Sequence, residues 1–158
     1  MSKKQLMSEF IAYAVQRFPA LRTTFIRREV EALRQDGLPI EVFSMRPADR
    51  AEVEKEQEAI PHLETTHYLP DRPIQGESIL ANLNTTAMRP VTGLRNWRLA
   101  IADAGAPGFV RRVRLWLQVW RGAVMARRLR QLGRCVHVHA QFADGAATTA
   151  LVAARLLG

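Results

Sequence analysis

Two histidines near the carboxyl terminus have the clearest chemical potential in this sequence. His137 and His139 stand at alternate positions of VHVHA (136–140), which predicts a strand with both imidazoles on one face. We expect Val136, Val138 and Ala140, on the other face, to be buried. Such a pair can supply two ligands to a metal ion. No third ligand follows at a suitable spacing, so we expect no metal site. We interpret the histidines as hydrogen-bonded groups in the sheet or near its end.

A second candidate site is the loop that follows the apolar segment FIAYAV at 10–15. That segment is typical of a strand covered on both faces. Thr23 or Thr24 can cap the next helix by accepting a backbone N–H, and the positive end of that helix then points at the loop, which favours a phosphate or sugar ligand. The candidate contacts are Arg17, Phe18, Pro19, Thr23 and Thr24. An ordinary turn shaped by Phe18 and Pro19 is the alternative.

Positive charge is concentrated in one segment, 89–134. It holds eleven arginines and one acidic residue, a net charge of +10, whereas the whole chain carries +8. A long helix is predicted at 109–132, with an apolar side made of Phe109, Val113, Trp116, Leu117, Trp120 and Val124. Arginines on the other side suit an anionic membrane surface. The candidate membrane-binding residues are Arg111, Arg112, Arg114, Trp116, Trp120 and Arg121.

Two alternatives remain for this helix. It can be an ordinary domain helix that buries its tryptophans and solvates its arginines. Nucleic acid ranks lower as a partner, because no nucleic-acid-binding motif and no exposed aromatics interleaved with the arginines are evident.

The elements that position these residues alternate between strand and helix. After the first strand, we predict a helix at 24–35 with an apolar face of Phe25, Ile26, Val30 and Leu33, and strands at 39–45 and 66–69. The acidic stretch at 46–60 is expected to be a surface helix or loop. Helices are expected at 76–88, 91–104 and 146–157, the last after a turn at 143–145. The pattern predicts an α/β fold, a Rossmann-like parallel sheet with flanking helices.

The length of 158 residues suits one domain, and a single cysteine excludes an internal disulfide. No apolar run reaches the length of a membrane span, and the amino terminus lacks a clear signal-peptide cleavage site. The dinucleotide-binding Gly-rich loop is also missing, because no glycine occurs before position 37. We therefore expect a cytoplasmic protein.

Two segments resemble the family 4 retaining glycosyltransferases, in the branch that acts in exopolysaccharide and colanic-acid-type synthesis. FPALRTTFIRREVEALRQDGLPIEVFSMR (18–46) resembles the opening of that family, and VHVHAQFADGAATTA (136–150) resembles its His-Ile-His-Ala-His-Phe-Ala segment. Arg22 and Thr23 stand where the family usually has Ser-Glu, and Gln141 replaces the third histidine. The long basic helical segment between them is also similar.

The resemblance implies the incomplete, truncated amino-terminal domain of a GT-B enzyme at 1–158, with the cleft residues above on its acceptor side. It implies metal-independent transfer of a sugar from a nucleotide-sugar to a lipid-linked or polysaccharide acceptor, at the inner membrane face. Family members bind the donor in a second domain, whose catalytic residues are expected beyond Gly158. The chain alone would hold no cofactor and be inactive. The rival is a non-enzymatic α/β module that binds anionic membranes or a partner protein through its Arg-rich helix.

Overall fold

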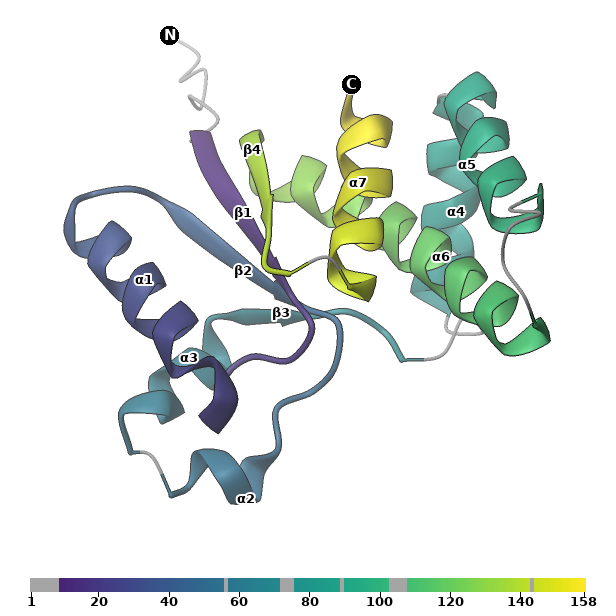
Figure 1. The fold of residues 1–158 in the computed structure, drawn as a ribbon. Helices are drawn as coiled ribbons and strands as arrows, with labels where there is room; N and C mark the ends of the chain where they lie inside the picture. Colours follow the sequence, from purple (N-terminus) through teal and green to yellow (C-terminus); the bar gives the residue numbers. More distant parts are fainter. Residues whose placement is uncertain (1–8, 56, 72–75, 89, 103–107, 143) are drawn as a thin grey trace, which may run out of the picture.

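A four-stranded, all-parallel sheet forms the centre of the protein (Figure 1). The structure, a computed structural model, describes residues 9–55, 57–71, 76–88, 90–102, 108–142 and 144–158. The strand order is β3-β2-β1-β4. The strands are β1 (Glu9–Val15), β2 (Ile40–Ser44), β3 (Thr66–Tyr68) and β4 (Arg134–Ala140). The predicted α/β class, a Rossmann-like parallel sheet with flanking helices, is confirmed.

Helices cover both faces of this sheet (Figure 1). On one side lie α1 (Thr24–Gln35), α2 (Arg50–Val53) and α3 (Ile60–Glu64), with short 3₁₀ turns at Leu21–Thr23 and Gln57–Ala59. On the other lie α4 (Gly76–Met88), α5 (Pro90–Ala102), α6 (Phe109–Leu132) and α7 (Gly145–Leu157). None of the described helices is long and apolar enough to cross a lipid bilayer.

The alternation of side chains along β1 divides the core in two. Ala12 and Ala14 face α6 and α7, and their small side chains leave room for close packing. Tyr13 and Val15 face α1, where they join Ile26 and Val30 in a second cluster. Burying one such Val or Ile side chain contributes about 1.5–3 kcal/mol, so both faces stabilise the strand. The predicted two-sided burial of this segment is confirmed.

A β-bulge in β4 changes which residues of that strand are buried. Phe10 pairs with Cys135 and Ile11 pairs with His137, so Val136 has no partner across from it. The extra residue lets Cys135 and Val138 face the same core. The prediction that Val136 is buried is therefore wrong: its side chain is 51% exposed.

The buried side of α6 also differs from the predicted one. Val119, Ala123 and Ala126, which were not on that side, are buried, whereas Phe109 is 80% exposed. The first turns of α6 extend past the start of α7, where Gln118 lies against Gly145, and residues 109–114 are exposed all around the helix (Figure 1). Helical periodicity identifies an apolar stripe on a helix, but it does not show how much of that stripe the neighbouring elements cover.

Close packing of α6 on α7 depends on a glycine. A Cβ atom added to Gly122 would lie 2.5 Å from Val152 Cγ1 and 3.0 Å from the carbonyl oxygen of Thr149. The Thr149 contact is with backbone, so the two helices would have to separate for a larger residue to fit.

We expect Gly122→Ala to lower the free energy of unfolding by about 1–3 kcal/mol because it overpacks this contact. Urea denaturation followed by circular dichroism measures the change. Gly76→Ala is the control, since a Cβ at Gly76 meets nothing within 4 Å. Equal effects of the two substitutions would show that the α6–α7 contact is not close-packed in solution.

Candidate functional site

The carboxyl ends of β1 and β4 form the place where ligands bind in folds of this kind. The two strands are neighbours, but the helices that follow them lie on opposite faces: α1 packs in one core cluster and α7 in the other. In open parallel sheets, a crevice opens at such a switch point, outside the carboxyl ends of the strands. Side chains near this end of β1 and β4 are therefore the candidates for contact with a ligand.

The Glu29 carboxylate on α1 is hydrogen-bonded both to β1 and to the residue that follows β4. The Tyr13 hydroxyl donates a hydrogen bond to Glu29 Oε1 over 2.8 Å, and Gln141 Nε2 donates one to Glu29 Oε2 over 3.1 Å. Burial, and secondly the Glu29 carboxylate, raises the pKa of Tyr13 to about 12. The phenol therefore stays protonated at neutral pH and remains a donor.

The two histidines of β4 lie on the face that carries Tyr13. The ring of His139 is 4.7 Å from that of Tyr13, centroid to centroid, and 6.2 Å from that of His137. His137 is exposed and His139 is half-buried. Within the described part of the chain, no group of three or more His, Cys, Asp or Glu side chains is arranged to hold a metal ion. The arrangement can offer imidazole and carboxylate groups to a hydroxyl-bearing ligand, whereas the Tyr13 phenol is buried and bound to Glu29.

The predicted contact residues of the first loop have mixed positions. Phe18 and Pro19 are buried; the Phe18 ring belongs to the core, and its backbone N–H donates to Ser44 Oγ over 3.0 Å. Arg17 is half-buried. A buried phenylalanine cannot contact a ligand in the crevice directly, so Phe18 fits the alternative in which it shapes the turn.

The two threonines of the loop serve the turn that precedes α1. The Thr23 hydroxyl donates to the Ala20 carbonyl over 2.9 Å and accepts the Ala20 N–H over 3.2 Å, while the Thr24 hydroxyl donates to the carbonyl of Leu21. The predicted side-chain cap is therefore wrong, since neither hydroxyl accepts an N–H of α1. The 3₁₀ turn occupies the residues that would otherwise form a free helix end.

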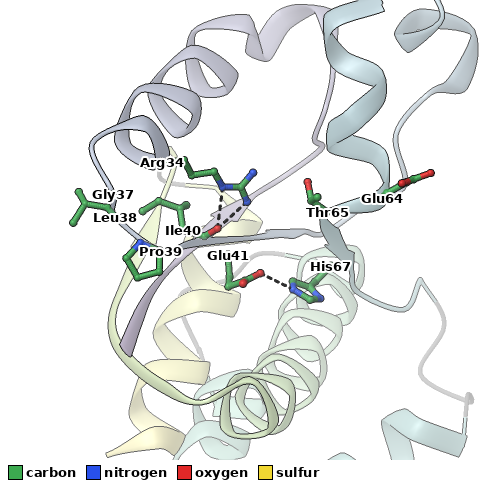
Figure 2. A pocket seen from close by; sticks show the side chains of 9 residues that line it. All are labelled: Arg34, Gly37, Leu38, Pro39, Ile40, Glu41, Glu64, Thr65 and His67. Carbon is green, nitrogen blue, oxygen red and sulfur yellow. Dashed lines mark hydrogen bonds and ion pairs between the residues drawn. The ribbon is translucent and has the colours of Figure 1, made fainter. Parts of the chain in front are cut away.

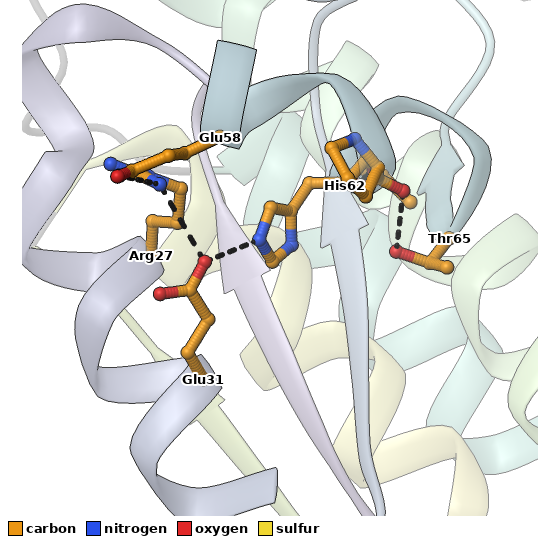
Figure 3. Close-up of polar contacts among 7 residues, drawn as sticks. Arg27, Glu31, Glu58, His62 and Thr65 are labelled. Atoms are coloured by element: carbon orange, nitrogen blue, oxygen red, sulfur yellow. Dashed lines mark hydrogen bonds and ion pairs between the residues drawn. The ribbon is translucent and has the colours of Figure 1, made fainter. Parts of the chain in front are cut away.

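An ion-pair cluster built around two buried side chains, Arg27 and His62, fixes α3 against α1 (Figure 3). Glu31 lies between Arg27 and His62, 3.6 Å from Arg27 Nη1 and 2.8 Å from His62 Nε2, and Arg27 also pairs with Glu58 at 3.0 Å. The His62 ring meets Phe18 edge-on, with centroids 5.6 Å apart. Through the contact between His62 and Phe18, the cluster stabilises the loop that follows β1, so its role is structural.

The predicted membrane-binding residues separate into two groups. Arg111, Arg112 and Arg114 are exposed on the first turns of α6. Arg121 instead points inward: its Nε donates to the carbonyl oxygen of Pro70 over 3.1 Å, and its Nη2 pairs with Asp71 at 3.2 Å. Burial lowers the pKa of Arg121, although Asp71 opposes that shift.

The two tryptophans of α6 pack together with a third from α5. Ring centroids of Trp97, Trp116 and Trp120 lie 5.3–6.1 Å apart. Trp120 is half-buried against the core, whereas Trp116 is exposed at the edge of the cluster. The tryptophans thus hold α5 to α6, and only Trp116 adds appreciable surface beside the arginines.

A hollow of about 450 Å³ lies elsewhere, at the amino ends of β2 and β3 (Figure 2). Its polar groups are largely paired within the protein: Glu41 Oε2 is 2.9 Å from His67 Nε2, and Arg34 donates twice to the Ile40 carbonyl. This edge is opposite to the switch point, so the hollow does not belong to the candidate site.

Sequence analysis alone missed Tyr13 and the contacts that join α1 to the end of β4. A tyrosine in an otherwise apolar strand was a usable signal, because a buried phenol usually finds a hydrogen-bond partner. Glu29 and Gln141 stand 112 residues apart, and nothing local indicates that they meet.

We expect Tyr13→Phe to lower the free energy of unfolding near neutral pH by about 1–2 kcal/mol, since it removes a hydrogen bond to a charged group. The folded pKa of Tyr13 is near 12 and its ordinary value is 10.0. The unfolded chain therefore loses this proton first, and the stabilisation, complete below pH 10, is lost as the pH rises towards 12. Urea denaturation between pH 7 and 12 tests this. An alkaline loss of stability of the same size in the wild type and in Tyr13→Phe would contradict it.

Comparisons of the chain with known protein families, with curated proteins and with solved structures give no significant match.

Proposed function

We propose that this chain is the acceptor-side domain of a retaining glycosyltransferase of GT-B architecture. One observation carries the proposal: the two segments that resemble family 4 enzymes meet in space at the switch point. Glu29 from the first segment accepts a hydrogen bond from Gln141 of the second, and Phe25 contacts Phe142. Sequence matches that arise by chance have no reason to converge on one edge of the sheet.

The side chains at this edge suit the recognition of an acceptor. Glu29 can accept a hydrogen bond from a sugar hydroxyl, and the imidazoles of His137 and His139 can donate or accept one. Arg17, half-buried in the first loop, can contact a phosphate of a lipid-linked acceptor. In this proposal a second Rossmann-like domain binds the nucleotide-sugar donor, and the residues of this chain hold the acceptor hydroxyl towards it.

The test is transfer of a radiolabelled sugar from nucleotide-sugars to membrane extracts, catalysed by the product of the complete reading frame. We expect Glu29→Gln and His139→Ala each to lower kcat/KM by roughly 10-fold or more, since a lost hydrogen bond of 1.5 kcal/mol corresponds to about a factor of ten. The control is His67→Ala, in the hollow at the opposite edge (Figure 2).

Two results would contradict this proposal. The first is turnover by residues 1–158 alone, because the proposal assigns the donor to another domain. The second is an unchanged kcat/KM in both crevice variants, which would place the acceptor elsewhere.

A second proposal concerns the first turns of α6, which favour attachment to an anionic membrane. Arg111, Arg112 and Arg114 are exposed there beside Phe109 and Val110, which are exposed by 80% and 63%. Arginine and exposed apolar side chains on one short segment match an interface of anionic headgroups and acyl chains. The segment extends beyond the start of α7 at the carboxyl edge of the sheet (Figure 1). A membrane bound there would bring a lipid-linked acceptor near the crevice, on the cytoplasmic side.

We expect the chain to sediment with anionic vesicles and not with neutral ones, and to lose binding as salt rises. Replacing Arg111, Arg112 and Arg114 by Gln should weaken binding by roughly 100-fold, at about 1 kcal/mol for each basic residue near the surface. The matched control replaces three exposed arginines of other elements, Arg22, Arg28 and Arg46. Equal losses in both triple variants would show a non-specific charge effect.

A further inference from the structure

Two phenylalanines that are about half exposed meet at the switch point. Phe25, in the first turn of α1, is 51% exposed, and Phe142, two residues after β4, is 58% exposed. Their rings meet edge-to-face, with centroids 5.9 Å apart and planes at 76°. The sequence predicted Phe25 on the buried face of α1, and this prediction is wrong. Exposed aromatic side chains that gather at a candidate site are a frequent mark of ligand contact.

The backbone at Phe142 adopts a conformation that phenylalanine disfavours. Its φ is +66°, and it is the one non-glycine residue with a positive φ in the described chain. Contacts on either side hold it there: the Gln141 N–H donates to the Ala14 carbonyl over 3.0 Å, and Asp144 caps α7 by accepting the Ala146 N–H over 2.8 Å. Glycine or asparagine would fit this conformation better. A strained, exposed phenylalanine is a candidate for a functional role.

The phenylalanines form a contact that links α1 to the end of β4. Phe25 and Glu29 are four residues apart, so they share one face of α1, and Phe142 directly follows Gln141. The hydrogen bond between Glu29 and Gln141 is therefore next to the contact between Phe25 and Phe142. The apolar surface of the two phenylalanines therefore lies beside the Glu29 carboxylate and the Gln141 amide. Tyr13, which donates to Glu29, also contacts the imidazole of His139.

We propose that Phe25 and Phe142 form a platform for the apolar face of a sugar ring in a neutral saccharide. A pyranose presents C–H groups on its faces and hydroxyls around its rim, so a ring packed on the phenylalanines would direct hydroxyls to Glu29 and His139. The four residues of these contacts carry one negative charge, that of Glu29, which disfavours an acidic sugar on this surface. The inference rests on the proposed acceptor role and assigns the surface that holds the acceptor's sugar.

The test is saturation-transfer difference NMR on the 158-residue chain with the methyl glycosides of glucose, galactose and mannose, and with cellobiose. We expect saturation to reach the ring C–H protons of at least one probe. Phe25→Ala and Phe142→Ala should each weaken its binding about fivefold, since an aromatic contact contributes near 1 kcal/mol. Phe109→Ala is the matched control, because Phe109 is 80% exposed on α6.

Sugar binding that is indifferent to both phenylalanines would overturn the platform and leave the acceptor role standing. No binding of any probe by the wild-type chain would overturn the platform and weaken the acceptor role as well.

Phe142→Gly separates a ligand-binding role from a structural one. Because glycine accepts a positive φ, we expect this variant to melt at an unchanged or higher temperature while it loses sugar binding. A lower melting temperature with intact sugar binding would show that the pair only stabilises the fold, and would overturn the proposal.

Discussion

The burial of β1 on both faces is the constraint on which the other elements depend. Ala12 and Ala14 let α7 and α6 approach one face, and Tyr13 and Val15 pack with α1 on the other. A strand in this position must have a hydrogen-bonded neighbour on each edge, because an unpaired backbone group in the core costs free energy. The strands β2 and β4 supply these partners, and their parallel direction requires that helices make the connections.

The same strand creates the candidate site. Because α1 and α7 cover opposite faces, the carboxyl ends of β1 and β4 lie at a switch point, the position where open parallel sheets bind their ligands. Tyr13 belongs to the packed strand, yet its hydroxyl reaches Glu29. The position of this carboxylate is therefore fixed by the rigid core, and Gln141 joins it to the end of β4. Groups held in this way are well suited to recognise a ligand, since little order has to be gained on binding.

The basic helix α6 has two physically different halves. In its carboxyl-terminal half, Gly122 permits close contact with α7, and Arg121 is tied to Pro70 and Asp71. In its first turns, Arg111, Arg112 and Arg114 are exposed. The sequence shows one continuous run of arginines and tryptophans, but the fold uses part of it for internal contacts and leaves part of it available to a partner.

The sequence by itself determined the elements and the fold class. The apolar segment at 10–15 and the helix at 109–132 were predictable because strand and helix periodicity are properties of neighbouring residues. Only the tertiary structure decided which side chains meet: the bulge that exposes Val136, the inward turn of Arg121, and the exposed pair of Phe25 and Phe142. These outcomes depend on strand register and on how far each helix extends past its neighbours. Such features join residues up to 126 positions apart, as in the pairing of Ile11 with His137, and leave no local pattern.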